Sequence, residues 1–121
     1  MVDINLFGSV YVAKYAAIAM SKNKAYNEQG EKGVIIFVSS VAAEEGQKGQ
    51  IAYSATKGAV NGMMTPMARD LGRYNIRVAA IAPGIFETPL SSQMSDKVKE
   101  TLNKNTPMNR MGTVDEFAHF T

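Results

Sequence analysis

Tyr53 and Lys57, four residues apart, are the side chains of this sequence best suited to move a proton. On a helix this spacing places both side chains on one face, with their Cβ atoms about 5 to 6 Å apart. A free tyrosine has a pKa of about 10, whereas a general base works best when its pKa is near the working pH. The ionised phenol would therefore need a neighbouring cation, and Lys57 is a candidate for that cation.

Ser40 is the third candidate, because it ends the segment that contains the apolar run Val34 to Val38. A hydroxyl at the end of a buried strand can hydrogen-bond a substrate oxygen on which charge builds up. Ser40, Tyr53 and Lys57 are therefore interpreted as a carbonyl polariser, an acid/base and the group that tunes the acid/base. The alternative is structural, since a Tyr-x-x-x-Lys pair also arises by chance and helical tyrosines usually serve packing.

The apolar pattern predicts a chain in which helices and strands alternate. Mixed three- and four-residue steps indicate amphipathic helices, and continuous apolar runs indicate parallel strands that are covered on both faces. The predicted elements are a helix from Asp3 to about Met20, a loop from Ser21 to Gly33, a strand from Val34 to Val38, a helix from about Tyr53 to Leu71 and a strand from Arg77 to Ala82. This order predicts an α/β fold with a parallel sheet, in which ligands lie at the carboxyl ends of the strands. Ser40 and Pro83 both fall at such ends.

Further local signals lie inside and after the second helix. Pro66 predicts a kink, because proline removes a backbone donor and crowds the preceding turn. A short helix is predicted from Asp96 to Leu102, and the capping-box spacing of Thr113 and Glu116 predicts that another helix begins there. His119 is the only histidine and cysteine is absent, so we predict a packing or surface role for His119 and no metal site.

The composition argues against several classes of protein. With 121 residues, 45% of them apolar, the chain is long enough for one domain with a core. A net charge of +2 gives no support for nucleic-acid binding, and no apolar run approaches the roughly 18 residues of a membrane span. The absence of cysteine excludes a disulfide framework and agrees with a reducing compartment. We therefore expect neither nucleic acid nor membrane as a partner.

Ordered motifs along nearly the whole chain resemble the short-chain dehydrogenase/reductase family. Asp3 to Gly8 is similar to the helix that carries that family's catalytic asparagine, and Ser40, Tyr53 and Lys57 match its catalytic serine and its tyrosine–lysine pair. Pro83 to Pro89 resembles the nicotinamide-side loop, and Pro107 to Ala118 resembles the segment that follows the substrate loop.

The resemblance implies a set of site residues. The catalytic residues would be Asn5, Ser40, Tyr53 and Lys57, and the nicotinamide side of NAD would be bound by Tyr53, Lys57, Pro83, Gly84, Phe86 and Thr88. Tyr53 would remove the hydroxyl proton, Ser40 would hold the substrate oxygen, and Lys57 would tune Tyr53 while hydrogen-bonding the nicotinamide ribose. Asn5 would position a water that links Lys57 to solvent, or would simply cap its helix. Gln47 would reach the substrate, and Glu87 departs from the small residue expected beside this loop.

A narrower resemblance concerns the 3-hydroxyacyl-CoA dehydrogenase branch of the family. It rests on Ser40 to Gly58, Met67 to Leu71 and Ile76 to Val78. It implies an NAD-dependent oxidoreductase that interconverts a secondary alcohol and a ketone, with 3-hydroxyacyl-CoA thioesters or hydroxysteroids as substrates. A mitochondrial location is implied by the resemblance, and a cytoplasmic one otherwise. The resemblance also implies a homotetramer or homodimer for the complete protein.

The expected fold is the carboxy-proximal part of a Rossmann-like, doubly wound parallel sheet, with residues 1–121 forming a partial domain. The glycine-rich turn that holds a pyrophosphate in this fold is not found among these residues, and neither is the last strand. We therefore expect the 121-residue stretch by itself to be inactive. The alternative from another class is a noncatalytic, dehydrogenase-like structural subunit of a larger assembly.

Overall fold

The computed structural model describes residues 1–121, which divide into two units, Met1–Ala82 and Pro83–Thr121. The first unit contains a π-helical turn η1 (Asp3–Gly8) that continues into α1 (Ser9–Ser21), the strand β1 (Gly33–Val38), a short 3₁₀ turn η2 (Val41–Ala43), the long helix α2 (Ile51–Gly72) and the strand β2 (Ile76–Ile81). The helices and strands follow the predicted order, and their ends lie within two residues of the predicted ones, whereas the η2 turn was not predicted.

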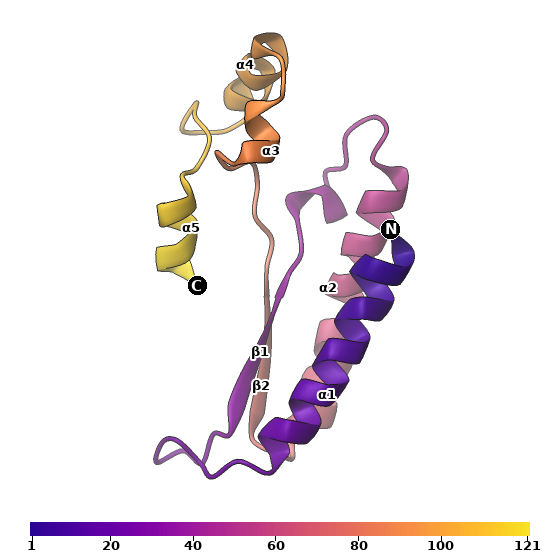
Figure 1. Cartoon of the computed structure of the whole chain (residues 1–121), viewed down its shortest axis with the longest axis vertical. Coiled ribbons are helices and arrows are strands. Elements are labelled where there is room, and N and C mark those ends of the chain that lie inside the picture. The colour runs from indigo at the N-terminus through magenta and orange to yellow at the C-terminus, as the bar shows by residue number, and fades with distance from the viewer. The chain divides into compact units, whose positions relative to one another are not determined.

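The two strands form a parallel pair (Figure 1). Gly33 pairs with Ile76 and Val38 with Ile81, and the pairing is extended by the Ser39 amide, which donates to the Ile81 carbonyl at 2.7 Å. The carboxyl ends of both strands therefore lie side by side. The α/β class and the parallel sheet predicted from the sequence are confirmed.

The helices α1 and α2 lie side by side and cover the same face of this sheet (Figure 1). The core that they enclose consists of Ala13, Ile35, Phe37, Val60 and Ile76, packed against partly buried methionines, leucine and alanines of the helices. Packing of helix side chains against alternate strand residues is the usual way in which one face of a sheet is shielded from solvent.

The opposite face of β1 is open in this structure, which contradicts the prediction that the strand is covered on both faces. Ile36 and Val38 point away from the helices and are 44% and 49% exposed, whereas Ile35 and Phe37 are buried. A continuous apolar run cannot distinguish a strand that is covered on one face from a strand that is covered on two, because every position is apolar in both cases.

The predicted loop between α1 and β1 is tied to the start of β2. The Glu31 carboxylate accepts hydrogen bonds from Tyr26 at 2.6 Å and Asn27 at 2.8 Å, and pairs with Arg77 Nε at 2.7 Å. The Tyr26 and Asn27 hydrogen bonds, followed by the Arg77 charge, lower the pKa of Glu31. The Lys32 amide also donates to the Asn75 carbonyl at 2.9 Å. These contacts give the segment a defined path, in spite of its polar composition.

The second unit contains three helices, α3 (Pro89–Ser92), α4 (Asp96–Lys104) and α5 (Val114–Phe120). Thr88 caps α3 and Thr113 caps α5, each in a reciprocal capping box. The predicted start of α5 at Thr113 is therefore confirmed, and the short helix predicted to end at Leu102 continues to Lys104. No helix in the structure is both long enough and apolar enough to span a membrane.

Candidate active site

Helix α2 places the predicted tyrosine–lysine pair on one face. The Lys57 ammonium lies 5.7 Å from the centroid of the Tyr53 ring and donates a hydrogen bond to the Val38 carbonyl at 2.7 Å. The carbonyl of the last β1 residue therefore fixes the ammonium close to the phenol. Both side chains are only partly buried, so a ligand can reach them.

The turn after β1 brings Ser39 and Ser40 to the same helix. Ser39 is 2% exposed, and its hydroxyl donates to the Lys57 carbonyl at 3.2 Å, which connects the strand end with α2. Ser40 has an extended backbone and caps η2, because its Oγ accepts a hydrogen bond from the Ala42 amide at 3.1 Å. This capping contact uses Ser40 Oγ as an acceptor. Its O–H therefore stays available as a donor to a substrate oxygen.

Asn5 is linked to the tyrosine–lysine pair through Thr56. The Asn5 side-chain amide donates to Thr56 Oγ1 at 3.2 Å, and the Thr56 hydroxyl donates to the Tyr53 carbonyl at 2.8 Å. Asn5 lies inside the π-helical turn, and Val2 rather than Asn5 occupies the position before it, without a side-chain cap. The capping alternative for Asn5 is therefore wrong, and the residue faces the segment of α2 that carries the candidate site.

Gln47 lies on the exposed loop between η2 and α2. Its backbone amide donates a hydrogen bond to the Gln50 side-chain oxygen at 2.9 Å. The Gln50 backbone amide donates in return to the Gln47 carbonyl at 3.0 Å. The turn is held by backbone atoms of Gln47, so its side chain is free to contact a ligand.

The remaining predicted site residues, Pro83, Gly84, Phe86 and Thr88, belong to the second unit. The Phe86 ring makes an edge-to-face contact with Phe117, with ring centroids 5.3 Å apart. The Thr88 hydroxyl accepts a hydrogen bond from the Ser91 amide at 3.2 Å and so starts α3. Phe86 and Thr88 therefore shape their own loop, in addition to any contact with a cofactor. Asn5, Ser40, Tyr53 and Lys57 thus lie in the first unit. The predicted nicotinamide-loop residues, Pro83, Gly84, Phe86 and Thr88, lie in the second.

The second unit also contains an ion pair that was not predicted from the sequence. Arg110 forms a two-pronged bridge to Glu116, with Nη2 to Oε1 at 2.6 Å and Nη1 to Oε2 at 2.9 Å. The Arg110 hydrogen bonds, together with the backbone N–H of Thr113, lower the pKa of Glu116 to about 2. Glu116 in turn raises the pKa of Arg110, to which the Glu87 charge also contributes.

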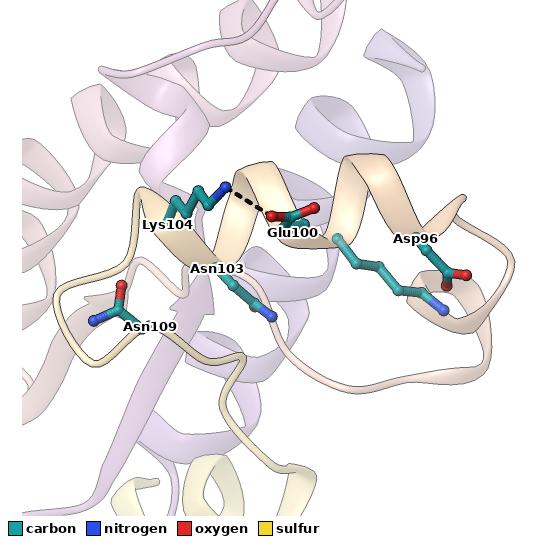
Figure 2. Close-up of a pocket in the computed structure, with 6 residues that line it drawn as sticks. Asp96, Glu100, Asn103, Lys104 and Asn109 are labelled. Atoms are coloured by element: carbon teal, nitrogen blue, oxygen red, sulfur yellow. Dashed lines mark hydrogen bonds and ion pairs between the residues drawn. The ribbon is translucent and has the colours of Figure 1, made fainter.

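A shallow hollow of about 490 Å³ lies on α4 (Figure 2). Asp96, Lys99, Glu100, Asn103, Lys104 and Asn109 line it. Lys104 pairs with Glu100 at 2.7 Å, and the Lys99 ammonium donates to the Ser92 carbonyl at 3.1 Å. Its two cations are thus already partnered, and none of the predicted site residues lies in it. His119 is exposed on α5 with Nδ1 2.7 Å from the Asp115 carbonyl oxygen, and no cluster of three or more potential metal ligands occurs.

Sequence reasoning missed residues that act through hydrogen bonds rather than through a motif. Ser39 and Thr56 are neighbours of predicted residues, and their burial at 2% each was not readable from a polar residue type. For the Arg110–Glu116 ion pair, the capping-box spacing of Thr113 and Glu116 was a usable signal for one of the two partners, Glu116. The partner of Glu116, Arg110, is six positions away across a turn, a separation that no helical or strand periodicity marks.

Known proteins match this chain along nearly its whole length. A family model described as "Enoyl-(Acyl carrier protein) reductase" matches residues 1–121. The 3-hydroxyacyl-CoA dehydrogenase type-2 of Rattus norvegicus is 46% identical over 120 residues, which are 98% of this chain and 46% of that protein. The acetoacetyl-CoA reductase of Synechocystis sp. is 36% identical over 118 residues, again 98% of this chain and 46% of the relative.

A solved structure extends the match to three dimensions. The crystal structure of 3-hydroxyacyl-CoA dehydrogenase type-2 from Mycobacterium avium matches with a TM-score of 0.92 at 38% identity, covering 98% of this chain and 46% of that chain. The chain spans about half the length of the curated relatives it matches. Its α/β fold is therefore similar to part of a Rossmann-like domain. From the family match and these relatives, the chain belongs to the short-chain dehydrogenase/reductase family.

Proposed function

We propose that residues 1–121 form the catalytic portion of an NAD-dependent oxidoreductase that interconverts a 3-hydroxyacyl-CoA and the corresponding 3-ketoacyl-CoA. The observation that carries this proposal is the Lys57 ammonium, which the Val38 carbonyl holds at 2.7 Å and which lies 5.7 Å from the Tyr53 ring. The substrate class is supported by relatives named 3-hydroxyacyl-CoA dehydrogenase and acetoacetyl-CoA reductase.

In the oxidative direction Tyr53 acts as the base. The ionised phenol oxygen takes the proton of the substrate hydroxyl, and the adjacent Lys57 charge stabilises the ionised form before the proton arrives. The Ser40 hydroxyl donates a hydrogen bond to the substrate oxygen as it becomes a carbonyl oxygen. In the reductive direction the same groups act in reverse, with Tyr53 as the acid.

The donor set around α2 fits the ribose of a nicotinamide cofactor. Lys57 has three N–H donors, and its hydrogen bond to Val38 uses one of them. The others can serve ribose hydroxyls, while Pro83, Gly84, Phe86 and Thr88 would hold the nicotinamide ring and its carboxamide. When bound, the nicotinamide supplies the hydride acceptor for oxidation and the hydride donor for reduction. Asn5 keeps the start of α2 in place through Thr56.

Replacing Tyr53 by phenylalanine in the complete natural protein tests this proposal. The variant keeps the ring and loses only the hydroxyl, so NAD binding measured by calorimetry should persist. Oxidation of a short 3-hydroxyacyl-CoA should fall by about a thousandfold, within the range that general acid–base catalysis contributes. Tyr74→Phe is the matched control, because Tyr74 is an exposed tyrosine beyond the end of α2.

The outcomes separate the candidate functions. Turnover of Tyr53→Phe near the parent rate would show that Tyr53 is not the acid/base. A parent protein that turns over neither acyl-CoA nor hydroxysteroid substrates would favour the noncatalytic structural subunit. Rates with NAD and NADP, measured on the parent, decide the cofactor, and a faster rate with a hydroxysteroid would replace the proposed substrate.

A further inference from the structure

The segment from Ile85 to Glu87 is paired with a single residue of a distant part of the second unit. Gly112 donates its amide to the Ile85 carbonyl at 3.1 Å, and its carbonyl accepts the Glu87 amide at 2.8 Å. Phe86 and Gly112 thereby form an isolated parallel bridge. The backbone hydrogen bonds of Ile85 and Glu87, the residues on either side of Phe86, therefore both depend on the position of Gly112.

A side chain at position 112 would displace the Phe86 ring. A Cβ atom at position 112 would lie 2.5 Å from Phe86 Cε1 and 2.7 Å from Cδ1, so the ring lies directly on the Gly112 backbone. Phe117 of α5 contacts the same ring edge to face. The Phe86 side chain therefore packs against both Gly112 and Phe117, and its position follows theirs.

The Arg110–Glu116 bridge closes around Gly112 from both sides. Besides its two contacts with Glu116, Arg110 Nη1 donates to the Met111 carbonyl at 3.0 Å. Glu116 Oε2 also accepts the Thr113 amide at 2.8 Å, while the Glu116 amide donates to Thr113 Oγ1 at 3.2 Å. One ion pair thus fixes the backbone on both sides of Gly112, at Met111 and at Thr113.

We propose that Arg110 and Glu116 are positioning residues for the oxidoreductase reaction. Their bridge holds Gly112 against Phe86, and through Gly112 it sets the conformation of the Pro83–Thr88 loop, to which the proposed function assigns the nicotinamide. This inference rests on that proposed function. It assigns to the bridge an effect on cofactor affinity rather than on the proton transfer at Tyr53.

Arg110→Gln and Glu116→Gln in the complete natural protein test the proposal. Each should raise the KM for NAD by about fivefold, the upper range for an exposed ion pair, and leave kcat at saturating NAD within about twofold. Because both variants break one bridge, the double variant should be no worse than either single one. Hydrogen exchange at the Glu87 and Gly112 amides should accelerate in all three variants.

Lys104→Gln is the matched control. It breaks the other exposed Lys/Arg–Glu pair of this unit, between Lys104 and Glu100 on α4, whose side chains form no hydrogen bond with the Pro83–Thr88 loop. It should leave the KM for NAD and the exchange of both amides unchanged. A similar rise in KM for Lys104→Gln would reveal general destabilisation and would overturn the positioning role.

The failures of the two proposals are distinguishable. An inactive parent protein would refute the proposed function, and the positioning role with it. An active parent whose Arg110→Gln variant keeps the parent KM for NAD would refute the positioning role alone. The same conclusion would follow from unchanged exchange at Glu87 and Gly112, or from a fall in kcat without any change in KM.

Discussion

At the residue scale, the Lys57 ammonium is ordered by the protein itself. Its hydrogen bond to the Val38 carbonyl links α2 to the last residue of β1. A flexible lysine loses side-chain entropy when it is ordered. Because Lys57 is already ordered by Val38, ligand binding does not have to include this entropy loss. Helical spacing alone brings Tyr53 and Lys57 to one face of α2. The hydrogen bond to Val38 additionally selects the lysine conformation in which the ammonium lies close to the Tyr53 ring.

Lys57→Ala should therefore impair two properties at once. The KM for NAD should rise because a ribose donor is lost, and the rise of activity with pH should move to higher pH because the phenolate loses its cation. Steady-state rates across a pH series measure both effects. Lys14→Ala, an exposed lysine of α1, is the control and should change neither. An unaltered pH profile for Lys57→Ala would contradict the role of this ammonium in tuning Tyr53.

At the scale of the element, the start of α5 depends on the ionised Glu116. Its pKa is about 2 in the folded chain, below the ordinary value of 4.5, so ionised Glu116 favours the folded state. The stabilisation is fully present above the ordinary pKa and is lost as the pH falls through the folded value. The capping box and the Arg110 bridge should therefore weaken between about pH 4.5 and pH 2.

Melting curves of the complete protein and its Glu116→Gln variant test this window. The Tm of the variant should be lower than that of the parent by a constant amount from pH 7 to about pH 4.5, and the difference should shrink at lower pH. Arg110→Gln should show the same convergence, because it removes the main cause of the lowered pKa. A Tm difference that persists unchanged at pH 2 would argue that Glu116 acts through packing.

The helices and strands could be predicted because each has its own apolar period. The first helix and both strands were found at nearly their true ends, and the capping box gave the start of α5 correctly. The coverage of β1 could not be predicted, because its alternate residues are equally apolar. The prediction of a polar loop before β1 gave no sign of the ion pair between Glu31 and Arg77, because these two residues are distant in the chain.

The candidate site was predictable to a different extent. Tyr53 and Lys57 form a local motif, so their proximity followed from spacing alone. The connection of Asn5 to Thr56 spans 51 positions, and only the packed fold reveals it. Nor could the sequence show that Phe86 and Thr88 hold their own loop together, since aromatic packing and capping are both properties of the folded segment.

At the scale of the whole molecule, α1 and η1 carry an exposed apolar face. Ile4, Tyr11, Val12 and Tyr15 are each more than half exposed. In α2, by contrast, Ile51 is the sole large apolar residue with comparable exposure, so the exposed apolar surface of the two helices lies mainly on the first one. An exposed apolar patch of this kind marks an interaction surface. We propose that it joins copies of the complete protein about a two-fold axis.

The complete protein should therefore sediment as a dimer or tetramer at micromolar concentration. Val12→Asp should shift it toward the monomer, because a carboxylate would be buried unpaired in the contact. Lys24→Gln alters the net charge by the same amount on an exposed loop and should leave the sedimentation coefficient unchanged. A parent protein that sediments as a monomer would count against the proposed contact.

The parallel pairing of β1 with β2 also sets the order of events during synthesis. Gly33 pairs with Ile76, and every later pair keeps this separation of 43 positions. At about 5 to 20 residues per second, β1 waits roughly 2 to 9 s after its own translation before its partner is made. During that interval the backbone groups of β1 that later pair with β2 are unpaired on the nascent chain. The nascent chain thus offers holdase chaperones a binding segment that disappears once β2 is translated and pairs.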